Sequence, residues 1–267
     1  MAYRLVALDL DGTLLGANAV LSPRNLSALR QLAQQGVHIC IITGRIPATA
    51  KVVTAAIDFP HLLAGYNGAL ITEQPTGKEL YRAWLQPAQV REVLACFQEL
   101  GLNDHCDVFS DECWYFTPYE EPYLSQTSRF DIATAPIPEK WPDVAAPKVM
   151  TIIARAVNQE ILQQVKRKLP GYEAVLSTPT LLEVTAGGVN KGTALRWMAD
   201  YLDVPIEATI AFGDQHNDVD MIRTAGFGVA MGNAVDAVKQ VAKHVTAHHK
   251  EDGVAVVLES LFSLAAS

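Results

Sequence analysis

The stretch that decides the fold is Leu5-Val6-Ala7-Leu8-Asp9-Leu10-Asp11-Gly12-Thr13-Leu14. It opens with an apolar run, which is typical of a buried strand. Two aspartates follow at the carboxyl end of that strand, where open parallel sheets bind their ligands. Residues i and i+2 of a strand face the same side, so these carboxylates repel each other unless a cation lies between them. Mg²⁺ takes oxygen ligands and needs few protein carboxylates when a phosphate supplies the others. The stretch therefore predicts a metal, a phosphate and a candidate nucleophile.

Strands and helices alternate on both sides of this stretch. Ser22-Pro23 opens an amphipathic helix that Gly36 ends, because Ser is a good N-cap and Pro fits the first helical position. Strand–helix–strand repeats indicate a parallel sheet with right-handed crossovers. The expected strands are 5–8, 37–42, 62–64, 208–212 and 226–229, and the expected helices are 23–35, 47–57, 192–201, 218–225, 234–241 and 254–264.

The middle of the chain has a different texture. From about Trp84 it mixes amphipathic helices with strands of alternating polarity, which favours an α+β unit with one exposed sheet face. Helices are expected over 87–100 and 158–169, and strands over 148–154, 172–176 and 181–184. The fold class is therefore α/β. A Rossmann-like, doubly wound parallel-sheet core (1–83 and 184–267) carries an inserted α+β cap (84–183).

Composition narrows the function. The 267 residues include 21 Lys and Arg against 29 Asp and Glu, a net charge of −8, and 49% are hydrophobic. An acidic chain is a poor non-specific nucleic-acid binder, so no nucleic-acid partner is expected. No apolar run is long enough for a membrane span and no signal peptide is recognisable, so we expect a cytoplasmic protein. The four cysteines lack C-x-x-C spacing and are interpreted as reduced structural residues rather than a zinc or disulfide site. The oligomeric state stays open.

Three more polar clusters follow or flank predicted strands. Thr43-Gly44-Arg45 offers a hydroxyl at a strand end, Asn190-Lys191-Gly192 a cation before a helix, and Gly213-Asp214-Gln215-His216-Asn217-Asp218 further carboxylates. Because the carboxyl ends of parallel strands lie on one edge, these groups should converge with Asp9 and Asp11. Carboxylates for a divalent metal, a hydroxyl and an ammonium for phosphoryl oxygens, and one nucleophilic carboxylate are then all present.

As an ordered set, these motifs resemble the haloacid dehalogenase-like phosphohydrolase superfamily. Asp-x-Asp-Gly-Thr, Thr-Gly-Arg, Asn-Lys-Gly and Gly-Asp-x-x-Asn-Asp occur in that order, and the insert resembles the C2-type cap of its Cof-like, type IIB phosphatases. The resemblance implies a Mg²⁺-dependent phosphatase that hydrolyses small phosphorylated metabolites through an aspartyl-phosphate. Sugar phosphates, nucleotide-like phosphates and cofactor phosphates are the implied substrate classes, and the cap would select among them.

The resemblance also implies a role for each motif residue. Asp9 would be the nucleophile and Asp11 the general acid and base, with Thr43 and Lys191 completing the catalytic set. Mg²⁺ would be held by Asp9, Asp11 through its backbone carbonyl, and Asp214. The phosphoryl oxygens would be bound by Leu10, Thr43, Gly44, Lys191 and Asn217. Asp218 would orient the metal ligands or join them, and Arg45 and Asn67 are possible substrate contacts.

Each motif also has a simpler explanation. Alone, Asp-x-Asp after a strand is as often a turn and helix cap, and Lys191 alone would be a solvated helix start. His216 is interpreted as a rim or capping residue, because neutral imidazole is a poor Mg²⁺ ligand. At the level of function, a phosphomutase of the same superfamily is the alternative enzyme. A receiver-like phospho-acceptor that stores a phosphoryl group is the alternative outside catalysis.

Two features bear on the substrate. Gly187-Gly188 and Gln215-His216 depart from the residues frequent in the family, and both affect the pocket rim rather than the reaction. The inserted block contains Asp111-Glu112-Cys113-Trp114-Tyr115-Phe116, followed by Tyr119 and Tyr123. Aromatic and acidic side chains suit stacking on a ring and hydrogen bonding to hydroxyls. The competing interpretation is that alternate members of this segment form the core of the insert.

Overall fold

The computed structural model describes residues 3–110, 113–117, 133–154 and 157–264 and divides the chain into two compact units. One unit comprises Met1–Arg82 and Asn190–Ser267, and the other comprises Ala83–Val189. The second boundary lies at Asn190 rather than at residue 184. The reason is that Leu181–Ala186 is one continuous strand, paired along its length with Tyr172–Leu176. Within the described residues, no helix combines the length and the apolar character needed to cross a bilayer.

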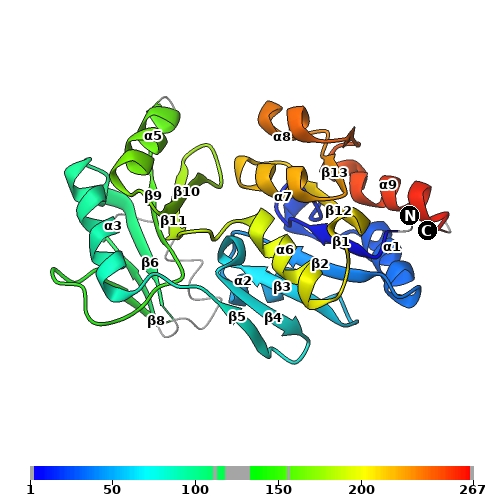
Figure 1. Ribbon diagram of the computed structural model, residues 1–267, viewed down its shortest axis with the longest axis horizontal. Coiled ribbons are helices and arrows are strands. Elements are labelled where there is room, and N and C mark those ends of the chain that lie inside the picture. The colour runs from blue at the N-terminus through cyan, green and yellow to red at the C-terminus, as the bar shows by residue number, and fades with distance from the viewer. Residues whose placement is uncertain (1–2, 111–112, 118–132, 155–156, 265–267) are drawn as a thin grey trace. The chain divides into compact units, whose positions relative to one another are not determined.

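The first unit is built on an eight-stranded sheet (Figure 1) with the strand order β14-β13-β12-β1-β2-β3-β4-β5. The strands are β1 (Leu5–Leu8), β2 (His38–Ile42), β3 (His61–Gly65), β4 (Leu70–Gln74), β5 (Glu79–Arg82), β12 (Thr209–Gly213), β13 (Phe227–Ala230) and β14 (His244–Val245). Six of them are parallel, from β14 through β3. The α/β fold class with a parallel core is confirmed. The antiparallel strands β4 and β5 at the edge were not expected from the sequence.

In the described residues of this unit, six α-helices connect and cover the strands. They are α1 (Pro23–Gln34), α2 (Pro47–Val53), α6 (Lys191–Tyr201), α7 (Val219–Thr224), α8 (Asp236–Val241) and α9 (Gly253–Phe262). The Ser22 hydroxyl caps α1 by accepting from Asn25 N, as the sequence predicts. The helix expected over 47–57 ends earlier, at Val53. In the helical layers, α1 packs against α9 and α6 against α7.

The hydrophobic core of this unit lies around β1. All four residues of β1 are fully buried, since β12 and β2 flank the strand and helices cover the sheet. A strand covered on both faces reads as a continuous apolar run, which is why Leu5 to Leu8 shows no alternation. From β1 the chain continues to β2, which pairs with β1 on one side. Strand β12, from the second half of the chain, pairs with β1 on the other side. This is the point of an open sheet where ligands bind.

The second unit contains a six-stranded sheet with the order β10-β11-β9-β6-β7-β8. Its strands are β6 (Cys106–Phe109), β7 (Cys113–Phe116), β8 (Ala133–Pro136), β9 (Val149–Ile152), β10 (Tyr172–Leu176) and β11 (Leu181–Ala186). Its helices, α3 (Pro87–Glu99) and α5 (Asn158–Lys168), bury residues such as Phe97 and Val165 in one core with the alternate strand residues Val108, Val149 and Leu182. The predicted α+β character of the insert therefore holds in these described residues.

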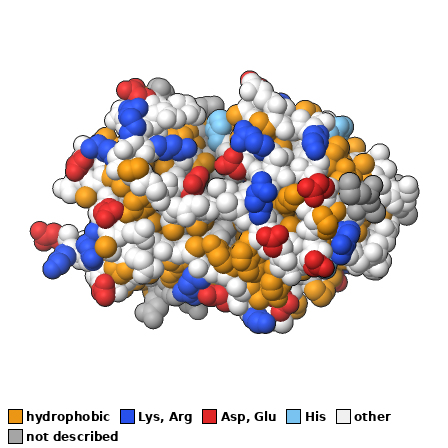
Figure 2. All heavy atoms as spheres, in the orientation of Figure 1, with side chains coloured by type: hydrophobic (Ala, Val, Ile, Leu, Met, Phe, Trp, Pro, Cys, Tyr) orange, Lys and Arg blue, Asp and Glu red, His pale blue; other side chains and the backbone are white. Residues whose placement is uncertain are grey.

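Charged side chains are spread over the surface. On the face shown in Figure 2, the basic side chains of the described residues are interspersed with acidic ones and do not gather in one stripe.

Candidate active site

The predicted residues converge at the carboxyl ends of three neighbouring strands of the first unit. Asp9 follows β1, Thr43 follows β2 and Asp214 follows β12, and all three are buried. Their backbones are fixed by the sheet, because Asp9 N donates to Phe212 O (3.1 Å) and Thr43 N donates to Ala64 O (2.9 Å). The positions of these side chains thus follow from strand register.

A buried ammonium lies between two of the carboxylates. Lys191, the first residue of α6, is 1% exposed, and its Nζ lies 2.6 Å from an oxygen of Asp9 and 2.6 Å from an oxygen of Asp218. Burial lowers the pKa of Lys191, but the carboxylates of Asp218 and Asp9 outweigh that effect and raise it above its ordinary value. Lys191 therefore remains an ammonium at any physiological pH.

Asp218 organises the loop that carries Asp214. One of its oxygens accepts from Lys191, and the other accepts the backbone N–H groups of Asp214 (2.8 Å) and Gln215 (2.9 Å). Both oxygens of the Asp218 carboxylate are thus already engaged by protein donors. The Asp218 side chain thus holds both Lys191 and the backbone of the 214–218 loop in place.

Oxygen atoms of Asp9, Asp214 and Asp218 lie within 4.8 Å of one another, and all three residues are buried. Three carboxylates face the single ammonium of Lys191, which leaves an excess of negative charge. Burial raises the pKa of Asp9 well above its ordinary value; Lys191 opposes this shift, and the neighbouring carboxylates add to it. Burial, reinforced by Asp218, raises the pKa of Asp214 to about 7. An all-oxygen donor set with uncompensated charge fits a hard divalent cation.

Asp11 lies at the exposed side of this cluster. Its carboxylate is 54% exposed and accepts both Nε (2.6 Å) and Nη2 (2.5 Å) of Arg45 in a two-pronged ion pair. The hydrogen bond to Asp11 raises the pKa of the Arg45 guanidinium. Arg45 was predicted as a possible substrate contact. In this structure its contact is with Asp11, so it positions the group predicted to act as acid and base.

Asn67 and Asn217 meet each other. Asn217 Nδ2 donates to Asn67 Oδ1 (3.0 Å), and Asn67 N donates to Thr43 O (2.8 Å). Tyr66 and Asn67 both have positive φ, a strained conformation that the following Gly68 shares at lower cost. Oδ1 of Asn217 is buried without a protein partner. The turn therefore brings two amides to the same strand edge as Thr43.

The backbone groups predicted to bind phosphoryl oxygens lie beside these side chains. Leu10 follows Asp9 directly, with its side chain buried in the core, and Gly44 follows Thr43. All predicted site residues thus belong to the first unit.

Three further residues around Asp214 were missed from the sequence. Thr13 Oγ1 donates to Oδ1 of Asp214 (3.0 Å). Gln215 Nε2 and Asn233 Nδ2 both donate to Oδ2 of Asp214, each at 3.3 Å. Thr13 belongs to the Asp-Gly-Thr motif, which was a usable signal. Asn233 lies in a turn after β13, and Asn in a turn is too common to signal a site.

The segment predicted to read the leaving group is only partly described. Residues 111–112 and 118–132 lie outside the described residues, and with them Asp111, Glu112, Tyr119 and Tyr123. Trp114 is buried, its ring lies tilted against that of Phe109 with 4.9 Å between the centroids, and its Nε1–H donates to Asp107 (2.8 Å). Tyr115 packs edge-on against Trp141. These aromatic residues therefore pack within the insert, as the competing interpretation held.

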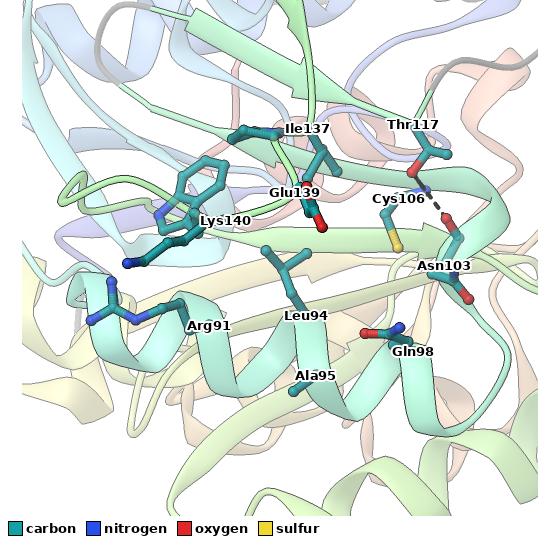
Figure 3. Close-up of a pocket in the computed structure, with 12 residues that line it drawn as sticks. Arg91, Leu94, Ala95, Gln98, Asn103, Cys106, Thr117, Ile137, Glu139 and Lys140 are labelled. Carbon is teal, nitrogen blue, oxygen red and sulfur yellow. Dashed lines mark hydrogen bonds between the residues drawn. The ribbon is translucent and has the colours of Figure 1, made fainter.

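The insert also contains a cavity of about 500 Å³ beside α3 (Figure 3). Arg91 and Lys140 lie at one end of it, and Asn103 and Thr117 lie at the other. None of the residues predicted for the site lines this cavity.

Comparison with known proteins gives the same family over nearly the whole chain. A family model described as haloacid dehalogenase-like hydrolase matches residues 6–258. An HMP-PP phosphatase of Yersinia pseudotuberculosis is 33% identical over 248 residues, covering 89% of this chain and 87% of the relative. A 5-amino-6-(5-phospho-D-ribitylamino)uracil phosphatase of Bacillus subtilis is 28% identical over 267 residues, covering 97% and 98%. The solved structure of a haloacid dehalogenase-like hydrolase from B. subtilis superimposes with a TM-score of 0.84 at 25% identity, covering 96% of this chain and 99% of that one.

Proposed function

Because the chain belongs to the haloacid dehalogenase-like hydrolase family and is a phosphoric monoester hydrolase, we propose that it uses Mg²⁺ and the nucleophile Asp9 to dephosphorylate small metabolites. One observation carries the proposal. A buried carboxylate at the end of β1 lies within reach of both a fixed ammonium and a second buried carboxylate, Asp214. This arrangement offers positive charge to a phosphoryl group and an oxygen nucleophile in the same place.

Asp9, Asp214 and the backbone carbonyl of Asp11 would hold the cation. When bound, Mg²⁺ supplies the charge that keeps the two carboxylates ionised and that balances the phosphoryl oxygens. The charge excess of the cluster and its all-oxygen donor set support this assignment. The Lys191 ammonium adds a second, permanent positive charge beside Asp9.

In the first half-reaction, an Asp9 oxygen attacks phosphorus. An aspartyl-phosphate bond forms while the bond from phosphorus to the leaving oxygen breaks, and protonated Asp11 gives its proton to that oxygen. In the second half, ionised Asp11 takes a proton from water as the water attacks the phosphorus, the bond between phosphorus and the Asp9 oxygen breaks, and inorganic phosphate leaves with the Asp9 carboxylate regenerated. Arg45 contacts Asp11 with two N–H groups, a contact that suits the ionised form of Asp11.

The remaining polar groups of the strand edge would bind the phosphoryl oxygens. Thr43, Asn217 and the backbone N–H groups of Leu10 and Gly44 offer donors there, and Asn67 holds Asn217 in place. Oδ1 of Asn217 has no protein partner, and as an acceptor it suits a hydrogen-bond donor, such as a substrate hydroxyl, rather than a phosphoryl oxygen.

The substrate is proposed to be a small phosphorylated metabolite: a sugar phosphate, a nucleotide-like phosphate or a cofactor phosphate. The names of the two phosphatase relatives support this class, since both denote small phosphorylated compounds. The phosphoryl-binding groups all lie in the first unit and cannot distinguish one monoester from another. We therefore assign the choice of leaving group to the inserted unit.

The test is a screen of the full chain against phosphorylated metabolites, with Mg²⁺, with EDTA and with Ca²⁺. We expect inorganic phosphate release that requires Mg²⁺. Ca²⁺ should inhibit, because it takes about 6–8 oxygens and can occupy both Asp9 oxygens. Full activity in EDTA would refute the metal site. Return of the phosphoryl group to the substrate would indicate a phosphomutase, and a long-lived phosphoaspartate without turnover would indicate a phospho-acceptor.

A further inference from the structure

Asn233 joins three loops at the proposed cation site. It lies in the turn between β13 and α8. Its Nδ2 donates to the carbonyl oxygen of Gly12 (2.8 Å) and to Oδ2 of Asp214 (3.3 Å). Its Oδ1 accepts the backbone N–H of His249 (3.0 Å). Because the partners are two acceptors and one donor, the orientation of the amide is unambiguous.

The turn that carries Asn233 is itself fixed to the Asp214 loop. Met231 N donates to Gly213 O (3.1 Å), and Val235 N donates to Asp214 O (2.9 Å). These bonds on either side of Asn233 leave its side chain little freedom to move relative to the Asp214 backbone. The amide can therefore hold the Asp214 carboxylate and the Gly12 carbonyl in fixed positions.

Gly12 and Asp214 approach each other so closely that there is no room for a side chain at position 12. A Cβ built on Gly12 would lie 2.4 Å from Oδ2 of Asp214, the same oxygen that Asn233 contacts. Gly12 belongs to the loop that begins at Asp9. The single Nδ2 group of Asn233 thus touches both sides of the gap between the two metal-binding loops.

We propose that Asn233 is a positioning residue, which holds the Asp214 carboxylate and the Asp9–Gly12 loop at the separation that a divalent cation requires. The inference rests on the proposed function. Thr13, which follows Gly12, also bonds to Asp214, and Gln215 orients the same carboxylate; Asn233 differs from both because its Nδ2 contacts Gly12 O and Asp214 Oδ2 together. As a neutral donor it orients the carboxylate without neutralising its charge, which stays available to the cation.

The test is a calorimetric titration of Mg²⁺ alone into the metal-free protein, which gives the Mg²⁺ dissociation constant. Thermal unfolding in EDTA is the second readout. Asn233→Ala should weaken Mg²⁺ binding about 10–100-fold, the usual effect of removing the partner of a metal ligand. If the alanine variant does not fold, Asn233→Leu replaces it, because leucine keeps the size of the side chain without its hydrogen bonds.

Asn25 provides a matched control. It is an asparagine of the same unit whose amide also bridges two backbone groups, donating to Leu14 O (3.1 Å) and accepting from Ala255 N (3.0 Å), without touching a site carboxylate. Asn25→Ala should lower the unfolding temperature and leave the Mg²⁺ dissociation constant unchanged. An Asn233 variant that also changes only the unfolding temperature would overturn the inference.

Asp214→Asn separates this inference from the proposed function. If Asp214→Asn abolishes Mg²⁺ binding while Asn233→Ala does not affect it, only the role of Asn233 is wrong. If Asp214→Asn binds Mg²⁺ as tightly as the wild type, the proposed cation site is wrong, and the inference is refuted with it.

Discussion

The Lys191 ammonium shows how much of this site depends on single buried side chains. It lies 2.6 Å from carboxylate oxygens of both Asp9 and Asp218, in an environment that water barely reaches. Removing one partner of a buried ion pair typically costs about 3–5 kcal/mol, because it leaves a charge uncompensated. Charge at this position is therefore tied to folding as well as to the proposed phosphate binding.

Asp11 is the residue whose role is easiest to separate by substrate choice. General-acid help is worth about 10²–10⁴-fold and matters least when the leaving group needs no proton. We expect Asp11→Asn to lose most of its turnover on alkyl phosphates and much less on an activated aryl phosphate. The measurement is kcat/KM on both substrates, and equal losses would remove Asp11 from the acid role.

For single residues, the sequence predicts positions well where a residue lies directly after a recognisable strand. Asp9, Thr43 and Asp214 could be predicted, because each directly follows a buried strand and strand ends share one edge. The contact between Arg45 and Asp11 could not, since the long and flexible Arg45 side chain can reach several different partners. Thr13 reaches Asp214 across 201 residues of sequence, a pairing that exists only once the sheet has formed.

At the scale of elements, the turn at Gly12 is important for the position of the Asp214 carboxylate. Gly12 has φ +79° and passes against Asp214, whereas Gly36, at the end of α1, has φ +81° and nothing within 4 Å of a built Cβ. The two glycines thus share a backbone conformation and differ in their surroundings.

Gly12→Ala and Gly36→Ala should therefore differ sharply. Alanine in the left-handed conformation costs about 1–2 kcal/mol at either position. Only at Gly12 does the added methyl group displace Asp214, so we expect a loss of about 10–100-fold in Mg²⁺-dependent turnover there alone. Urea unfolding and phosphate release of both variants provide the comparison. Similar activity losses would show that backbone strain, not the displaced carboxylate, is responsible.

Strand β6 carries a pH-sensitive carboxyl, Asp107, in the inserted unit. Burial raises its pKa to about 6, although the hydrogen bond from Trp114 and the charge of Lys148 oppose the shift. Its Oδ2 has no hydrogen-bond partner. Because the folded-state pKa exceeds the unfolded value of 3.8, the folded protein retains a proton that the unfolded chain has lost between these values.

This group should therefore make the protein less stable as the pH rises from about 4 to above 6, by up to about 3 kcal/mol at 1.36 kcal/mol per pKa unit. Asp107→Asn should remove that part of the pH dependence. Urea unfolding of both proteins at pH 4.5 and 7.5 measures it, and an unchanged difference between the two pH values would contradict the assignment.

Elements with strong signals could be predicted, and short ones could not. The helix that Ser22 caps begins where expected. Strands β4 and β5 were missed, because they are only five and four residues long and show no alternation of apolar and polar residues. Asn67-Gly68 is a residue pair typical of turns. Its role in holding Asn217 depends on a contact across 150 residues that no local pattern reveals.

For the whole molecule, the order of elements was the decisive information. An α/β pattern that stops near residue 83 and resumes later predicts one core interrupted by an insert, and the chain does divide at Arg82 and Asn190. The exact second boundary was beyond sequence analysis, since the last strand of the insert and the resumption of the core are separated by only a short connection. The core contains all the residues of the proposed chemistry, and we propose that the insert selects the substrate.

The central claim, that the strand edge around β1 is a phosphatase site with Asp9 as its nucleophile, is tested most directly by Asp9→Asn. Phosphate release from the best substrate of the metabolite screen should be measured with Mg²⁺ for the wild type and the variant, with circular dichroism as the check on folding. The account predicts release by the wild type and a folded variant whose turnover is reduced to background, because an amide oxygen cannot form the aspartyl-phosphate. A folded Asp9→Asn variant, free of contaminating phosphatase, that retains wild-type turnover would contradict it.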